Sequence, residues 1–238
     1  MQVVILAGGL VTRLGALTER IPKAMVPILG RPFLEHQITL LRENGVLDIL
    51  LCIGHYGDQI KAYFGDGRKF GVRIAYSEEG EALLGTGGAL KKAQALIDDR
   101  FFLMWGDSYL ILDYQAIWSS FIKSGALALM VVYKNNNQGI KSNVSLQHGK
   151  VAVYDKWQRH REMEYIDNGL SALNKDLLAR IPEHTYFEIE TIFGELAIEG
   201  ELAGYETSQK YFEIGSLEGI RELETLLKRR RIEREEQK

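Results

Sequence analysis

The sequence has little cysteine, no long apolar run and no excess of basic residues, and each of these shortages excludes a class of protein. Its 238 residues include one cysteine, Cys52, so an intrachain disulfide and a metal site built on several thiolates are excluded. No apolar run approaches the length of a membrane span, and residues 1–9 lack the basic start and long apolar core of a signal peptide. With 29 basic against 32 acidic residues, no basic field is available to hold a nucleic acid. We therefore expect a cytoplasmic globular protein that binds neither nucleic acid nor membrane.

Short apolar runs alternate with amphipathic stretches in the first half of the chain, which predicts an α/β fold. Strands are expected there over residues 3–7, 49–53, 73–76 and 101–105, and helices over 32–44, 58–64 and 89–97. In the second half, strands are expected over 126–133, 143–146, 151–154 and 165–173, followed by helices over 188–198 and 216–227. In the first half a helical crossover lies between each strand and the next, as parallel pairing requires, whereas turns and loops in the second half favour antiparallel pairing. The fold class expected is a Rossmann-like mixed, mainly parallel sheet flanked by helices, with an antiparallel subregion.

The first stretch that carries chemistry follows the first expected strand. Leu6 and Ala7 lead into Gly8 and Gly9, and a strand that ends in two glycines lets backbone N–H groups face an anion. The next residues bring Thr12 and the Arg13 guanidinium, and the Lys23 ammonium follows in Pro-Lys-Ala-Met-Val-Pro. Two cations in a short window suit a polyphosphate better than a neutral ligand. The glycine pair taken alone is more often a plain tight turn.

These two stretches resemble the Leu-Ala-Gly-Gly-x-Gly-Thr-Arg-Leu and Pro-Lys-x-Met-x-Pro motifs of the sugar-1-phosphate nucleotidyltransferases, or NDP-sugar pyrophosphorylases. The resemblance is nearest to short members such as the heptose- and mannose-1-phosphate guanylyltransferases. It continues, in the family's order, through Phe-Gly-Asp-Gly (64–67), Leu-Gly-Thr-Gly-Gly-Ala (84–89), Trp-Gly-Asp (105–107) and Tyr-Phe-Glu-Ile-Gly (211–215). The sequence departs from the family at Val11, where glycine is usual, and at Glu213, where many members have aspartate. The resemblance implies a fold of the nucleotide-diphospho-sugar transferase type.

The resemblance also implies a reaction in which a sugar 1-phosphate attacks a nucleoside triphosphate and pyrophosphate leaves. A phosphate monoester is mostly dianionic at pH 7, so catalysis requires positioning and charge neutralisation rather than a strong base. By resemblance, Arg13, Lys23 and Asp107 are the catalytic residues, and Asp107 and Glu213 hold Mg²⁺. On local sequence alone, Asp107 is equally well a helix cap or turn residue.

Binding residues follow from the same motifs. The predicted nucleotide-binding set is Leu6, Ala7, Gly8, Gly9, Thr12, Arg13, Glu79, Gly87 and Gly88, and the predicted sugar-phosphate set is Lys156, Asn168, Gly169 and Glu188. A carboxylate only accepts hydrogen bonds, so Glu79 fits guanine or uracil and favours GTP or UTP. Glu79 is equally explained as part of a solvated acidic loop, and Glu188 by the dipole of the helix that it starts.

We expect residues 1–238 to form a single catalytic domain. It would comprise a nucleotide-binding half (1–125), a sugar-phosphate-binding half (126–215) and a C-terminal helix with a charged tail (216–238). One alternative is a cytidylyltransferase that acts on a non-sugar phosphomonoester such as phosphocholine. Another is a catalytically weakened nucleotide- or sugar-binding sensor, suggested by Val11. The identity of the sugar and the choice between monomer and homodimer stay open.

Overall fold

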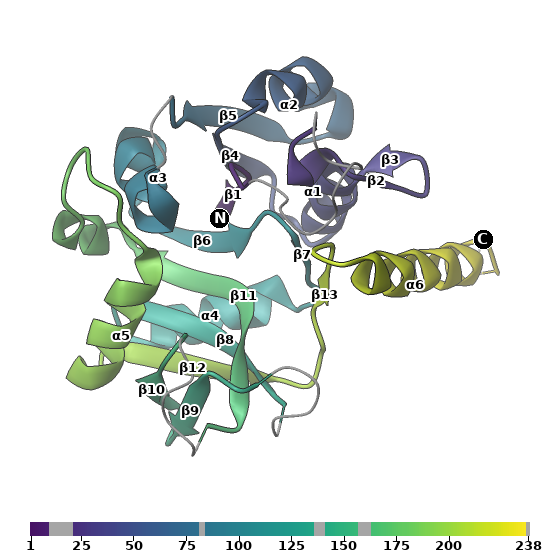
Figure 1. Cartoon of the computed structure of the whole chain (residues 1–238). Coiled ribbons are helices and arrows are strands. Elements are labelled where there is room, and N and C mark those ends of the chain that lie inside the picture. The colour runs from purple at the N-terminus through teal and green to yellow at the C-terminus, as the bar shows by residue number, and fades with distance from the viewer. Residues whose placement is uncertain (10–20, 81–83, 136–140, 157–162, 237–238) are drawn as a thin grey trace.

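A nine-stranded mixed sheet runs through the computed structural model, which describes residues 1–9, 21–80, 84–135, 141–156 and 163–236 (Figure 1). Its strands are β1 (Gln2–Leu6), β4 (Asp48–Ile53), β5 (Arg73–Glu78), β6 (Arg100–Trp105), β8 (Ala128–Lys134), β9 (Val144–Gln147), β10 (Lys150–Tyr154), β11 (Tyr165–Asn174) and β12 (Leu202–Thr207). In space they lie in the order β5-β4-β1-β6-β11-β8-β12-β10-β9. The pairs among β5, β4, β1 and β6 are parallel, and β11 enters antiparallel between β6 and β8. The expected fold class is confirmed.

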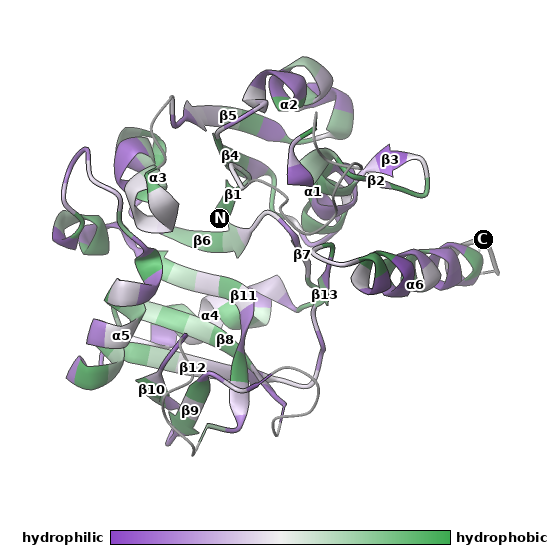
Figure 2. Cartoon of the chain, in the orientation of Figure 1, coloured by the Kyte–Doolittle hydropathy of each residue, from purple (hydrophilic) through white to green (hydrophobic). Residues whose placement is uncertain are grey.

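Helices cover both faces of this sheet. They are α1 (Phe33–Glu43), α2 (Gly57–Phe64), α3 (Gly85–Ala93), α4 (Tyr114–Ser124), α5 (Ile189–Glu199) and α6 (Leu217–Glu236). Val3 and Ile5 of β1 are buried in one core with side chains of α1, α2 and α4, while Val4 is buried in a second core with side chains of α3 and α5. Successive strand residues point to opposite faces, so a strand covered on both sides is apolar throughout. Figure 2 shows these strands as largely hydrophobic.

Short elements beside the sheet bring distant segments together. They are the strands β2 (Pro27–Ile28), β3 (Arg31–Pro32), β7 (Ser108–Tyr109) and β13 (Phe212–Glu213), and the 3₁₀ turns Lys23–Met25, Arg68–Phe70, Gln94–Leu96 and Lys175–Arg180. β13 pairs antiparallel with β7. A third core, which includes Phe33, Tyr109 and Leu223, fixes the start of α6, and the rest of that helix projects from the body (Figure 1). Within the described ranges, no helix is both long and apolar enough to cross a membrane.

One α-helix and one strand of the main sheet were not expected, and α3 (Gly85–Ala93) begins four residues before the helix expected over 89–97. Helix α4 was not expected, although Asp113 caps its start by accepting from Ala116 N (2.9 Å) and Gly125 ends it at φ +65°. Strand β12 was not expected either, and it pairs parallel with β8 inside the half where antiparallel pairing was predicted. A glycine in its middle, Gly204, weakens the strand signal, but it leaves the space that the Leu146 side chain fills.

Candidate active site

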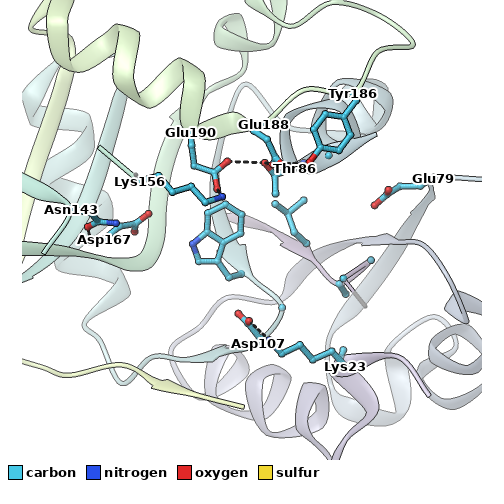
Figure 3. A pocket seen from close by; sticks show the side chains of 18 of the residues that line it. Lys23, Glu79, Thr86, Asp107, Asn143, Lys156, Asp167, Tyr186, Glu188 and Glu190 are labelled. Atoms are coloured by element: carbon cyan, nitrogen blue, oxygen red, sulfur yellow. Dashed lines mark hydrogen bonds and ion pairs between the residues drawn. The ribbon is translucent and has the colours of Figure 1, made fainter. Parts of the chain in front are cut away.

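A cleft of about 600 Å³ opens where β1 and β6 end (Figure 3). Open α/β sheets bind ligands at the carboxyl ends of their parallel strands. The predicted site residues that line this cleft are Leu6, Ala7, Gly8, Gly9, Lys23, Glu79, Asp107, Lys156 and Glu188. Most of the described residues that the motifs single out are therefore brought together in one place.

Close backbone contacts shape the floor of the cleft. The Gly106 N–H donates to Leu6 O (3.0 Å), and the Ala7 N–H donates to Cys52 O (2.8 Å). A Cβ atom at Gly106 would collide with Leu6 O, so only glycine lets the chain turn so closely over β1. This turn carries Asp107 from the end of β6 into the cleft.

One wall of the cleft carries an ion pair. Lys23 Nζ lies 2.6 Å from Asp107 Oδ2, and the two side chains are 20% and 32% exposed. The pairing of β13 with β7 sets Glu213 opposite Ser108, next in the chain to Asp107. A Cβ atom at Gly215 would lie 2.7 Å from Glu213 Oε2 and 3.4 Å from Lys23 Nζ. Lys23, Asp107 and Glu213 thus form a single cluster, although Glu213 is far from the other two in sequence.

The opposite wall carries a second cluster, shown in Figure 3. Lys156 Nζ forms an ion pair with Glu190 Oε1, and the Tyr186 hydroxyl donates to Glu188 Oε1. Thr86 Oγ1 lies 2.7 Å from Glu188 Oε2. Burial acts to raise the pKa of Glu188, but the hydrogen bonds from Tyr186 and Thr86 outweigh it and leave that pKa below its ordinary value.

Asp167 lines the cleft close to this second cluster. Its Oδ1 atom accepts from the Gly169 N–H (2.9 Å). Burial raises the pKa of Asp167 to about 7, with a smaller contribution from the charge of Glu190, while the Gly169 N–H and the Lys156 ammonium act against the rise. The side chain therefore changes its charge close to neutral pH.

This raised pKa predicts a pH-dependent cost to stability. Well below pH 4 Asp167 is protonated in both the folded and the unfolded chain, so its ionisation does not lower the free energy of unfolding there. Between about pH 4 and pH 7 the unfolded chain ionises first, so the cost grows, and it is complete above pH 7. We expect Asp167→Asn to raise the free energy of unfolding by roughly 4 kcal/mol more at pH 8 than at pH 4, which corresponds to a shift of about three pKa units. Urea unfolding of both proteins at the two pH values measures this, and a difference that does not change with pH would contradict the raised pKa.

Glu79 and its neighbour Glu78, which the sequence does not tell apart, have different surroundings. Glu78 is exposed and pairs with Lys61 (2.7 Å). Glu79 is half-buried, and its Oε1 atom would lie 2.5 Å from a Cβ atom at Gly8. Burial raises the pKa of Glu79, opposed by a hydrogen bond from the Leu84 backbone. Glu79 therefore faces Gly8 rather than bulk solvent.

Five of the predicted residues that the structure describes do not line the cleft: Glu213, whose position near Lys23 is given above, and Gly87, Gly88, Asn168 and Gly169. The N–H groups of Gly87 and Gly88 both donate to Phe187 O (2.8 and 3.1 Å), so their predicted contact with a nucleobase stays a prediction. Asn168 is only 1% exposed and donates through Nδ2 to Gln209 O (3.3 Å), and Gly169, at φ +88°, lets β11 pass close to the Trp105 ring. Adjacent strand residues point to opposite faces, so Asp167 faces the cleft where Asn168 cannot.

The family's Asn-x-Gly spacing contains the signal for this difference. Counted back from Gly169, that spacing reaches Asp167 rather than Asn168. Other cleft residues that the sequence reasoning missed are Ala24, Gly85, Thr86, Trp105, Gly106, Asn143, Tyr154, Tyr186 and Glu190. Val11, Thr12 and Arg13 lie outside the described residues, so their predicted roles stay predictions.

Comparisons with known sequences and structures identify the family of this chain. The family described as nucleotidyl transferase matches residues 2–227. A UTP–glucose-1-phosphate uridylyltransferase of Synechocystis sp. is 31% identical over 79% of this chain and 53% of its own length, so the chain spans about half of that relative. A D-glycero-α-D-manno-heptose 1-phosphate guanylyltransferase of Aneurinibacillus thermoaerophilus is 30% identical over 89% of this chain and 87% of its own. The crystal structure of HddC from Yersinia pseudotuberculosis complexed with GMP-PN has a TM-score of 0.75 and 29% identity, covering 93% of this chain and 96% of that one. This chain therefore belongs to the nucleotidyl transferase family.

Proposed function

We propose that this chain transfers a nucleotidyl group from a nucleoside triphosphate to a sugar 1-phosphate and releases pyrophosphate. The observation that carries the proposal is the presence of two lysine–carboxylate pairs, Lys23–Asp107 and Lys156–Glu190, on opposite walls of one cleft (Figure 3). A reaction between two phosphate-bearing substrates needs a cation beside each of them. The relatives named above, a uridylyltransferase and a guanylyltransferase, support the same reaction class.

In the proposed reaction, a nonbridging oxygen of the sugar phosphate attacks the α-phosphorus of the triphosphate. The bond from that phosphorus to the α,β-bridging oxygen breaks, and pyrophosphate leaves with this oxygen. Lys23 lines the same cleft as Gly8 and Gly9 and suits the triphosphate, with Arg13 as the proposed contact to the leaving pyrophosphate. Lys156 lies on the other wall and suits the attacking phosphate. No side chain has to remove a proton, since the attacking group is already mostly dianionic.

The cluster around Asp107 fits a divalent metal, which members of the family typically use. Asp107 and Glu213 supply hard oxygen donors, and the described residues contain no group of three or more acidic, histidine or cysteine ligands. Mg²⁺ is typically held by one or two carboxylates, with substrate phosphates completing its shell. We therefore propose that these two carboxylates hold Mg²⁺, which when bound would neutralise charge on the phosphates. With Mg²⁺ on Asp107, the Lys23 ammonium that pairs with this carboxylate would contact a substrate phosphate instead.

The substrates proposed follow from the acceptor groups that line the cleft. Glu79 offers only acceptors and suits the N–H groups of guanine or uracil, which favours GTP or UTP. Glu188 and Asp167, on the other wall, suit sugar hydroxyl donors. Together these assignments make 1–125 the nucleotide half and 126–215 the sugar-phosphate half of one catalytic domain. The choice between monomer and homodimer stays open.

Pyrophosphate release with a panel of substrates tests the proposal. GTP, UTP, CTP and dTTP are each combined, with Mg²⁺, with heptose, mannose or glucose 1-phosphate or with phosphocholine. We expect release with GTP or UTP and one of the sugar phosphates. Release only with CTP and phosphocholine would identify a cytidylyltransferase instead. Calorimetric binding of a nucleotide without any release would identify a sensor.

A further inference from the structure

Thr86, at the start of α3 on the nucleotide side, contacts the acidic wall of the sugar side. Its Oγ1 atom lies 2.7 Å from Glu188 Oε2 and 3.0 Å from Glu190 Oε2, and it accepts from the Ile189 N–H (2.9 Å). The Thr86 N–H also points to Glu188 Oε2 (3.3 Å). One hydroxyl thus meets both carboxylates and the first turn of α5, about a hundred residues further along the chain.

Backbone hydrogen bonds hold Thr86 in this position. The Phe187 N–H donates to Leu84 O (2.8 Å), and Phe187 O accepts from the next two glycines of the Gly-Thr-Gly-Gly motif. A Cβ atom at Gly87 would lie 2.8 Å from the Phe187 ring, and one at Gly88 would lie 2.8 Å from Thr185 O. The two glycines allow the segments to approach closely enough for the Thr86 hydroxyl to reach both carboxylates.

The hydrogen-bonding capacity of the hydroxyl limits what it can do. It has one proton to donate, and the Ile189 N–H, which no intrahelical carbonyl can accept, already occupies one lone pair. Its proton can go to only one of the two carboxylates at a time, and the shorter distance favours Glu188. Glu190 Oε2 then keeps a lone pair for another donor. Its Oε1 atom receives the Lys156 ammonium, and the side chain of Glu190 is only 11% exposed.

We propose that Thr86 is a positioning residue for the sugar-phosphate side of the cleft, acting through Glu188, Glu190 and the Lys156 ammonium. This inference rests on the proposed function. The alternative is that Thr86 contacts the nucleotide, as predicted for its neighbours Gly87 and Gly88. The two assignments predict effects on different substrates.

The test compares Thr86→Val, which keeps the shape and removes the hydroxyl, with Thr86→Ser, which keeps the hydroxyl. The substrates are the triphosphate and sugar phosphate that release pyrophosphate fastest in the panel. We expect Thr86→Val to raise KM for the sugar phosphate by about tenfold, with KM for the triphosphate changed by less than about twofold. Thr86→Ser should restore KM for the sugar phosphate to within about threefold of wild type. Thr191→Val, at an exposed threonine of α5, is the matched control and should change neither value.

A rise in KM for the triphosphate, or equal losses in Thr86→Val and Thr86→Ser, would overturn the inference. Thermal unfolding of each variant shows whether it is folded, and Thr86→Ala replaces Thr86→Val if the latter is not. Titration calorimetry with mannose 1-phosphate alone adds a readout that does not require turnover: binding weakened by Thr86→Val and restored by Thr86→Ser supports the inference, and unchanged binding contradicts it. Failure of the proposed function is distinct, because wild type would then release no pyrophosphate with any pair.

Discussion

Asp107→Asn is expected to lower kcat/KM for pyrophosphate release by more than about 100-fold, because loss of one preorganised electrostatic contact in a reaction of this kind typically costs that much. The substitution keeps the size of the side chain and removes the charge that faces Lys23 at 2.6 Å. It also removes one of the two carboxylates proposed to hold Mg²⁺. Steady-state kinetics at saturating and at limiting Mg²⁺ measure the loss, which we expect to be larger at limiting metal.

The fold should survive this substitution. The pair is partly exposed, and such a pair contributes roughly 1 kcal/mol to the free energy of unfolding. For a chain of this length that corresponds to a fall in Tm of about 2–4 °C. Asp99→Asn is the matched control, because Asp99 is an exposed aspartate at the opposite end of β6, and it should leave activity unchanged. Activity of Asp107→Asn within a few-fold of wild type at limiting Mg²⁺ would contradict the assignment of Asp107.

Lys156→Met is expected to raise KM for the sugar phosphate by about 10- to 150-fold, which corresponds to loss of a charge-assisted hydrogen bond of about 1.5–3 kcal/mol. The Lys156 side chain is 45% exposed, lines the cleft and pairs with Glu190, so a phosphate can reach its ammonium from the cleft. KM for the triphosphate should change by less than about threefold. Initial rates with each substrate varied in turn separate the two values.

Lys150→Met is the control for this prediction. Lys150 is the first residue of β10 and Lys156 follows the last residue of that strand, so the two lysines lie near opposite ends of β10. The Lys150 ammonium donates to Gly200 O (2.9 Å), away from the cleft, so its loss should leave both KM values unchanged. Equal rises in both KM values for Lys156→Met would show that the lysine does not discriminate between the substrates.

The residues of the Lys23–Asp107 wall could be named from the sequence because each lies in a motif that resembles the family's motifs. Asp107 follows a buried apolar strand, and Lys23 lies in a motif with two prolines. The structure places these two in contact, and it brings Glu213 to them through the pairing of β13 with β7. Local sequence alone left Asp107 equally well a cap or turn residue, and the resemblance decided in favour of the site at the carboxyl edge of the sheet.

The sugar side was less predictable because its contacts join segments far apart in the chain. The Lys156–Glu190 pair and the hydroxyl of Thr86 meet only once α3, β10 and α5 have packed together. The choice between Asp167 and Asn168 depends on which face of β11 each residue occupies, and a one-residue error in register exchanges the two faces. The sequence therefore predicts that a sugar-binding wall exists better than it predicts which side chains form it.

The central claim is that an oxygen of the sugar phosphate attacks the α-phosphorus, and isotope transfer tests it most directly. The sugar 1-phosphate is prepared with ¹⁸O at its nonbridging phosphate oxygens and is turned over with the triphosphate that the panel identifies. Mass spectrometry of the two products then locates the label. The proposed reaction places all of the label in the nucleotide sugar and none in the pyrophosphate. Label in the pyrophosphate, or a nucleoside monophosphate in place of the nucleotide sugar, would contradict it.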